Sequence, residues 1–261
     1  MMTTLKAIKA SCFLQMKQSF SRPMFQFCIL VYPILFGWIL YMMYQDSNQA
    51  ELIGYVMLGT AIGSLWGSIS FSSAGDIERE RFMGTLEIIF NTPTKFIAVM
   101  LGKVIGNTVL GVCSMIVSFV FIMVTFKVPL IINNPLLFTI SAIVSILSYI
   151  AIAMLMSACF TLSRNARALM NCMEYPVYIL CGIVFPIEIL PVWTRPLSYI
   201  LSPTYTVKLL RMTMLGIENY NEYYILLGIL FMITIIYSLL AVSFYGFIDK
   251  RTRVLATLGV H

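Results

Sequence analysis

The chain has 261 residues, of which 60% are hydrophobic and only 11% are charged, whereas a soluble domain carries roughly 25% charged residues. This composition excludes a soluble globular protein, and the net charge of +6 is interpreted as membrane topology rather than as nucleic-acid binding. Several apolar runs exceed the roughly 20 residues that cross a bilayer as a helix, and the alternating polar positions of a membrane barrel are missing, so we predict an all-α integral membrane protein.

Residues 3–20 are predicted to form an amphipathic helix on the inner membrane surface. Apolar side chains recur there at helical spacing: Leu5, Ile8, Cys12, Phe13, Met16 and Phe20. Three lysines lie elsewhere on the same helix: Lys6, Lys9 and Lys17. A frayed terminal tail is the alternative. We expect no cleavable signal peptide, because the first apolar run starts too far from the terminus.

Six membrane spans follow, which we place at 24–44, 52–74, 97–126, 136–162, 169–187 and 222–247. The whole chain, residues 1–261, is predicted to be a single transmembrane domain. It comprises an interfacial helix at 1–22, the six spans within 24–247 and a cytoplasmic tail at 248–261.

The lysines and arginines predict the orientation, because loops on the cytoplasmic side are enriched in them. With a cytoplasmic N-terminus, 13 of the 17 basic residues fall in inner segments and 4 in outer ones. The outer four are Lys127, Arg195, Lys208 and Arg211. Both termini are therefore predicted to be cytoplasmic, in the cell membrane.

The stretch GDIERERFMGTLEIIFNTP, residues 75–93, carries five of the 28 charged residues at positions 76–81. We predict a separate cytoplasmic helix between spans two and three, capped by Ser72 or Ser73 and ended by Pro93. Its apolar face holds Phe82, Leu86, Ile89 and Phe90 and is expected to press on the membrane helices. The opposite stripe, which would meet water or a protein, holds Glu80, Gly84, Glu87 and Asn91. A merely solvated helix is the alternative.

The segment from Pro186 to Asn221 is predicted to lie outside and to form short re-entrant helices, because it is rich in prolines yet strongly apolar. Within the spans, Gly59, Gly63 and Gly67 form a small-residue ladder, which indicates close helix packing or a smooth wall along a transport path. Glu174 and Glu188 are candidates for that path or its gate. Glu174 is alternatively a structural carboxylate that pairs with Arg167 or Arg164, and Glu188 alternatively faces water.

Catalytic and metal sites are not expected. The only histidine is His261, and the six cysteines lie in apolar stretches without a CxxC pair. The only Gly-Lys pair, Gly102-Lys103, is followed by Val104, so the chain has no P-loop for ATP.

Two motifs resemble ABC-2 type transporter permeases. One comprises Glu80, Arg81, Gly84, Thr85, Leu86, Glu87, Thr92, Pro93, Leu101, Gly102 and Lys103. The other is FPIEILPVWTRPLSYILSPTY, residues 185–205, with its Phe-Pro, Leu-Pro and Ser-Pro marks. The resemblance implies that the 75–93 helix is a coupling helix, which docks together with the N-terminal helix on a separate ATPase subunit.

The resemblance further implies two ATPase copies that bind ATP and Mg²⁺, and a second permease chain that is either identical or a sibling. Glu80, Arg81 and Glu87 would make polar contacts with the ATPase, and Gly84 would allow close approach, with Thr85 in the same motif. Arg164 and Arg167 would add a second contact or serve only as positive anchors.

The predicted function is that of a permease subunit of an ATP-driven exporter for an amphipathic or hydrophobic substrate, such as a drug, a peptide antibiotic or a lipid-linked molecule. An ion-coupled transporter without an ATPase is the alternative, although no intramembrane Asp/Glu/His relay supports it. A membrane-embedded enzyme or a passive assembly subunit is a third candidate.

Overall fold

The computed structural model describes residues 2–48, 51–90, 92, 94–128, 132–163 and 166–255. Throughout this part the chain is helical, with turns between the helices. The long helices are α1 (Met2–Phe20), α2 (Pro23–Tyr44), α4 (Leu58–Phe82), α6 (Phe96–Phe126), α7 (Pro135–Leu162), α8 (Ala166–Leu180) and α11 (Tyr220–Leu255). The short ones are η1 (Leu52–Met57), α5 (Thr85–Phe90), η2 (Ile187–Ile189), α9 (Arg195–Ile200) and α10 (Ser202–Leu215).

Five stretches of the described residues are long and apolar enough to cross a membrane. They are Pro23–Tyr44, Leu52–Phe82, Phe96–Phe126, Pro135–Leu162 and Tyr220–Lys250. They coincide with the predicted spans one, two, three, four and six. The second runs beyond its predicted end at residue 74.

The predicted fifth span at 169–187 is not confirmed as a continuous helix. Its helix, α8, has 15 residues and ends at Leu180, which is short of the roughly 20 residues that a span needs. Gly182 follows with a φ of 73°, a left-handed conformation that glycine adopts readily and that ends helices. Pro186 follows a further four residues on.

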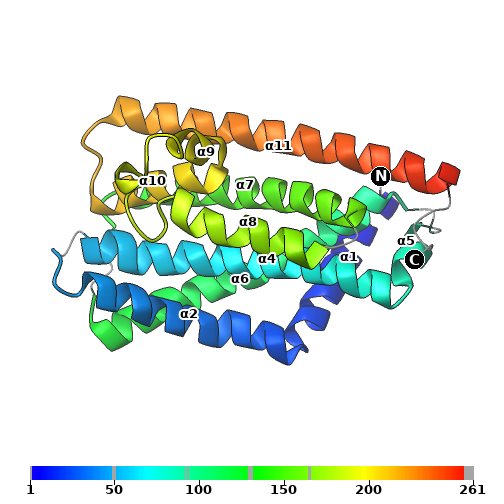
Figure 1. Cartoon of the computed structure of the whole chain (residues 1–261), viewed down its shortest axis with the longest axis horizontal. Coiled ribbons are helices and arrows are strands. Elements are labelled where there is room, and N and C mark those ends of the chain that lie inside the picture. The colour runs from blue at the N-terminus through cyan, green and yellow to red at the C-terminus, as the bar shows by residue number, and fades with distance from the viewer. Residues whose placement is uncertain are drawn as a thin grey trace.

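Helix α4 lies at the centre of the bundle. In its most apolar window 89% of the residues are buried, against 17–39% in the other candidate spans. It packs against α2, α6, α7 and α8, while α11 packs along α7 (Figure 1). One end of the bundle carries the start of α1, helix α5 and the end of α11, and we call it the α5 end. The other carries α9 and α10, and we call it the α10 end.

The segment after α8 forms the predicted short helices, η2, α9 and α10, at the α10 end. Arg211 on α10 ties this end together, because its guanidinium donates hydrogen bonds to the Gly54 carbonyl, at 3.2 Å, and to the Gly182 carbonyl, at 3.4 Å. The same group lies 3.8 Å from the ring centroid of Tyr55, in a cation–π contact. Burial lowers the pKa of Arg211, although a guanidinium stays charged at neutral pH.

Helix α1 lies directly on α6 (Figure 1). A Cβ atom added to Gly102 would lie 2.5 Å from the carbonyl oxygen of Ile8, and one added to Gly106 would lie 2.8 Å from that of Cys12. The two glycines are four residues apart and so share one face of α6. This close contact requires glycine, because any larger side chain would separate the helices. Away from α6, helix α1 exposes the large apolar side chains Leu5, Phe13, Leu14 and Phe20, together with its three lysines, Lys6, Lys9 and Lys17.

Candidate functional site

The charged stretch does not begin a new helix, which corrects the predicted boundary near residue 75. Helix α4 continues without a break from the membrane region to Phe82, so no cap at Ser72 or Ser73 is needed. The break comes at Met83 and Gly84, where Gly84 has a φ of 67° and the six-residue helix α5 follows. The left-handed φ is what requires glycine at this position. We call residues 82–85 the α4–α5 turn.

The predicted faces of this segment are wrong at two positions. Phe82 was expected to press on the membrane helices, but its side chain is 90% exposed at the tip of α4. Glu80 was expected to meet water or a protein, but it is half-buried against α6. The helix is interrupted at Gly84, so the apolar face cannot be followed through it as in one helix. The directions of the side chains before Gly84 are set by α4, and those after it by α5.

Glu80 forms an ion pair with Lys103 of α6. The Thr85 hydroxyl also donates a hydrogen bond to the Glu80 carboxylate. Lys103 is only 7% exposed, so this pair is shielded from water and is stronger than a surface pair. Two of the predicted coupling residues, Glu80 and Thr85, are therefore joined to each other and fix the α4–α5 turn against α6.

Arg81 reaches the end of α7 and donates hydrogen bonds to the carbonyl oxygens of Ser163, at 2.8 Å, and Thr161, at 2.9 Å. These are carbonyl groups that the end of a helix leaves without an intrahelical partner. The remaining predicted coupling residues fall outside the part that the structure describes, namely Arg164 and the side chains of Arg167 and Glu87.

A buried polar cluster joins α1, α4 and α6. It lies one helical turn from the Glu80–Lys103 ion pair, toward the middle of α4. The Asp76 carboxylate, 5% exposed, accepts hydrogen bonds from Asn107, at 2.8 Å, and from Gln15. It also forms an ion pair with Arg22 at 2.6 Å. Ser19 donates to the Asn107 side-chain oxygen at 3.1 Å. We call these five residues the Asp76 cluster.

The Asp76 cluster was not predicted from the sequence, although a signal for it existed. Asp76 and Glu80 are four residues apart on α4, and Lys103 and Asn107 are four residues apart on α6. Each pair therefore lies on one helix face, and two antiparallel helices bring the pairs into register. Together these contacts connect α1, the C-terminal part of α4 and the first part of α6 into one body.

The glycine ladder of α4 is buried between helices. A Cβ atom on Gly59 would lie 2.5 Å from the Ile183 carbonyl oxygen, and one on Gly63 would lie 2.7 Å from a ring carbon of Phe36. Gly67 faces α8, where the Glu174 carboxylate lies 3.8 Å from its ideal Cβ position. This geometry fits the packing interpretation, and a role in a transport path stays a prediction.

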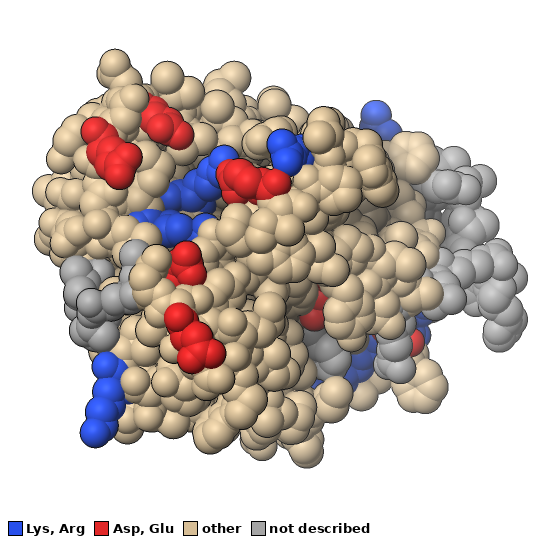
Figure 2. Space-filling view, turned by 60° about the vertical axis from the view of Figure 1, so that its left-hand side comes forward, with Lys and Arg blue, Asp and Glu red and all other residues tan. Residues whose placement is uncertain are grey.

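Glu188 is exposed on η2 at the α10 end. Its backbone carbonyl accepts a hydrogen bond of 2.7 Å from Arg195, which also donates to the Leu190 carbonyl at 3.1 Å. Figure 2 shows this end of the molecule, with Lys and Arg side chains set back in the surface and acidic side chains around them. The carboxylate of Glu188 thus faces solvent, and a gating role stays a prediction.

The comparison with family models matches residues 43–243 to the description "ABC-2 family transporter protein". This match covers most of the chain and contains α4, the α4–α5 turn and the segment after α8. The chain belongs to the ABC-2 family. No curated protein matches it.

An ABC-2 protein is a membrane transport component, and membership implies association with an ABC ATPase. The five long apolar helices agree with a multi-pass membrane protein. In the part of this ABC-2 chain that the structure describes, no three His, Cys, Asp or Glu side chains are grouped as a metal site would need.

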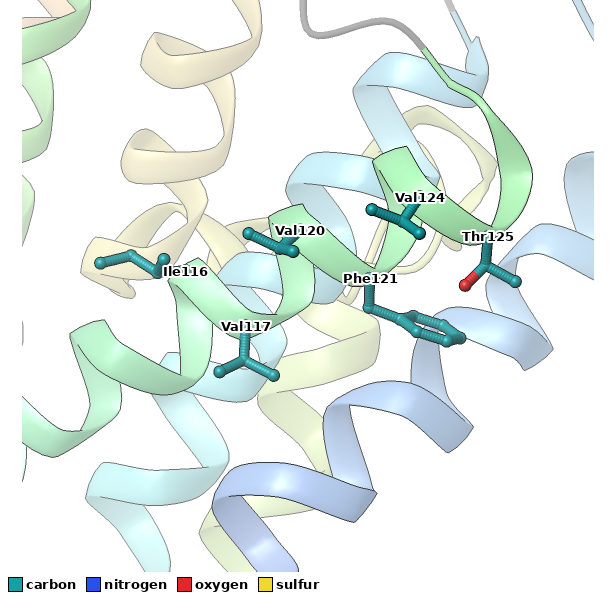
Figure 3. Close-up of a pocket in the computed structure, with 6 residues that line it drawn as sticks. All are labelled: Ile116, Val117, Val120, Phe121, Val124 and Thr125. Atoms are coloured by element: carbon teal, nitrogen blue, oxygen red, sulfur yellow. The ribbon is translucent and has the colours of Figure 1, made fainter.

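The ABC-2 chain also has a shallow apolar groove along the second half of α6. Ile116, Val117, Val120, Phe121, Val124 and Thr125 line it, and Figure 3 shows that all six come from this one helix. Such a surface suits lipid chains, because it offers apolar contact and almost no hydrogen-bonding group.

Proposed function

We propose that this ABC-2 protein is the permease subunit of an ATP-driven exporter in the cytoplasmic membrane, and that it moves an amphipathic or hydrophobic substrate. A separate ABC ATPase, in two copies that bind ATP and Mg²⁺, would supply the energy to a pair of permease chains, identical or sibling. The observation that carries the proposal is the exposed apolar tip of the central helix in a chain of the ABC-2 family.

The proposed topology has six crossings with the α5 end in the cytoplasm. The bias of 13 basic residues to 4 supports this orientation. Helix α8 and the irregular segment after it would make the fifth crossing, because α7 ends and α8 begins near the α5 end, whereas α11 begins at the α10 end. Helix α1 would lie at the inner membrane surface, where its exposed apolar side meets lipid.

The ATPase contact is assigned to apolar rather than charged side chains. Phe82 is 90% exposed, Met83 56% and Ile88 64%, and all three lie on or next to the α4–α5 turn. Glu80 and Arg81 are already bonded to α6 and α7, so their proposed role is to hold the turn rigid. In the proposed topology these large apolar groups extend beyond the membrane on the cytoplasmic side, and exposed apolar groups there indicate a protein partner.

The proposed coupling is mechanical. Closure of the two ATPases would displace the α4–α5 turn, and α4 would transmit the displacement as a rigid body, because it continues from the turn into the membrane region without a break. The Asp76 cluster would carry α1 and α6 along with it.

The test is co-purification of the chain with its ABC ATPase from the native membrane. Phe82→Asp and Met83→Asp should reduce the ATPase recovered at least about tenfold, since burying an unpaired charge opposes docking. The melting temperature of the permease should stay unchanged. Trp193→Asp is the matched control, because Trp193 is 77% exposed at the α10 end. Full recovery of the ATPase with the double variant would refute the assigned contact.

An ion-coupled transporter that acts without an ATPase is the second candidate. Glu174 favours it, because an intramembrane carboxylate is a common ion or proton site. Transport by the isolated chain in vesicles, driven by an ion gradient in the absence of ATP, would establish this candidate and reject the exporter.

A further inference from the structure

Glu174 projects from α8 toward the central helix α4. The carboxylate lies 3.8 Å from the ideal Cβ position of Gly67 and is partly buried. The ion pairs Arg22–Asp76 and Lys103–Glu80 leave it out. A carboxylate in an apolar bundle is costly unless a positive charge lies beside it, and among the described side chains none is paired with Glu174, which points to a ligand that supplies the charge.

Aromatic side chains lie near this carboxylate, since the Tyr178 hydroxyl oxygen and Tyr32 Cε1 lie 2.7 and 3.7 Å from the same ideal Cβ position of Gly67. Tyr32 and Phe36 of α2 stack with centroids 5.7 Å apart, and Phe36 meets Tyr178 of α8 edge-on at 5.5 Å. The Tyr178 hydroxyl donates a 3.0 Å hydrogen bond to the Gly63 carbonyl and is thereby fixed. Tyr32 and Tyr178 both interact electrostatically with Glu174.

The glycines of α4 lie directly beneath these side chains. Cβ atoms on Gly63 and Gly67 would each lie 2.7 Å from an atom of an aromatic side chain, namely Phe36 Cε1 and the Tyr178 hydroxyl oxygen. The aromatic side chains therefore rest on the bare backbone of α4. Tyr32, Phe36 and Glu174 remain partly exposed, so a ligand can reach them, and we call these three residues the Glu174 site.

We propose that the Glu174 site binds the cationic group of the substrate, so that the cargo is an amphipathic organic cation such as a substituted ammonium. The inference rests on the proposed transport function. Glu174 supplies the countercharge, and the faces of Tyr32 and Phe36 supply cation–π attraction, which is stronger where water is excluded. The apolar part of the cargo would lie against the surrounding helices.

Cys28 offers a probe of the Glu174 site, because its partly buried thiol lies close enough to Glu174 to interact with it electrostatically. We would replace the other five cysteines and keep the full chain in membranes with its ATPase. The rates at which Cys28 reacts with a trimethylammonium-bearing and a sulfonate-bearing methanethiosulfonate give a charge-selectivity ratio. Glu174→Gln should lower this ratio about tenfold. Glu218→Gln, which changes an exposed carboxylate before α11, should leave it unchanged.

A matched ligand pair provides a readout that needs no further variant. Benzyltrimethylammonium should slow the reaction of Cys28 with a neutral reagent, whereas neopentylbenzene, its uncharged carbon analogue, should not. An unchanged ratio in Glu174→Gln, or equal protection by both compounds, would overturn the proposal. Protection needs no ATPase. If the complex showed no ATP-driven transport but benzyltrimethylammonium still protected Cys28, the exporter function would be rejected and cation binding at the Glu174 site would be supported.

Discussion

Asp76 shows how one side chain can determine the arrangement of three helices. It is buried on α4 toward the α5 end and is bonded to Arg22, Gln15 and Asn107, which lie before α2, on α1 and on α6. A buried charge is tolerated only when such partners replace its water. Removing Asp76 would leave three polar groups, one of them charged, without their shared acceptor.

We therefore expect Asp76→Ala to lower the free energy of unfolding by about 3–5 kcal/mol, the cost of breaking a buried ion pair. Thermal unfolding of the purified permease in detergent measures the change. Glu188→Ala is the control, since this exposed side chain should contribute less than about 0.5 kcal/mol. Equal melting temperatures for the two variants would contradict the structural role of Asp76.

At the scale of elements, the position of α1 depends on two glycines in α6. Gly102 and Gly106 bring the backbones of α1 and α6 into contact, and the Asp76 cluster adds directional bonds beside them. A larger side chain at either glycine would not fit. The atoms nearest to each glycine include backbone carbonyl oxygens, which cannot move away as a flexible side chain can.

Gly102→Ala should therefore displace α1 and destabilise the permease by about 1–3 kcal/mol. Limited proteolysis should cleave α1 faster in this variant, and thermal unfolding should give the energy. Gly228→Ala in α11 is the matched control, because no atom lies within 4 Å of its added Cβ. If α1 were equally protected in both variants, the close contact would not hold α1 in place.

The sequence predicted most elements, because long apolar runs report directly on membrane helices. The sequence did not predict where a helix ends when the end depends on the conformation of a single residue. The charged stretch looked like a separate helix, yet α4 runs on to Phe82 and breaks only at Gly84. Likewise α8 stops before Gly182 although its apolar run continues. Apolar content does not show where a glycine adopts a left-handed conformation.

At the scale of the molecule, the α5 end and the α10 end are each closed by polar contacts, with an apolar bundle between them. The Asp76 cluster lies toward one end, and Arg211 with its carbonyl partners lies at the other. Polar groups are least costly near the two membrane surfaces, so this distribution agrees with a bundle that stands across the bilayer.

The proposed orientation can be tested by cysteine labelling. In a background without the six native cysteines, Met83→Cys should react with a membrane-impermeant thiol reagent only from the cytoplasmic side, and Trp193→Cys only from outside. Both side chains are well exposed, at 56% and 77%, so access is decided by the membrane alone. Labelling of Met83→Cys in intact cells would reverse the assigned topology.

The candidate sites were less predictable than the fold. Glu80 and Arg81 were selected from a motif, but only tertiary contacts reveal that they bond to Lys103 and to the end of α7. Glu174 was recognised as a costly carboxylate, whereas the rings around it come from α2 and from another turn of α8. Which residues face one another across helices is decided by packing, and a periodic pattern in one helix contains no such information.

The stretch from Leu52 to Phe82 spans 31 residues. Its first six residues, η1, are π-helical, and the other 25 form α4, which is about 38 Å long at 1.5 Å per residue. Helix η1 provides the Gly54 carbonyl that Arg211 holds, and the last residue of α4 is the exposed tip. A swing of about 5° at the tip would shift the other end of α4 by about 3 Å. Because α4 has no break between Leu58 and Phe82, a displacement at the proposed ATPase contact would also move the half of the bundle that lies farthest from it.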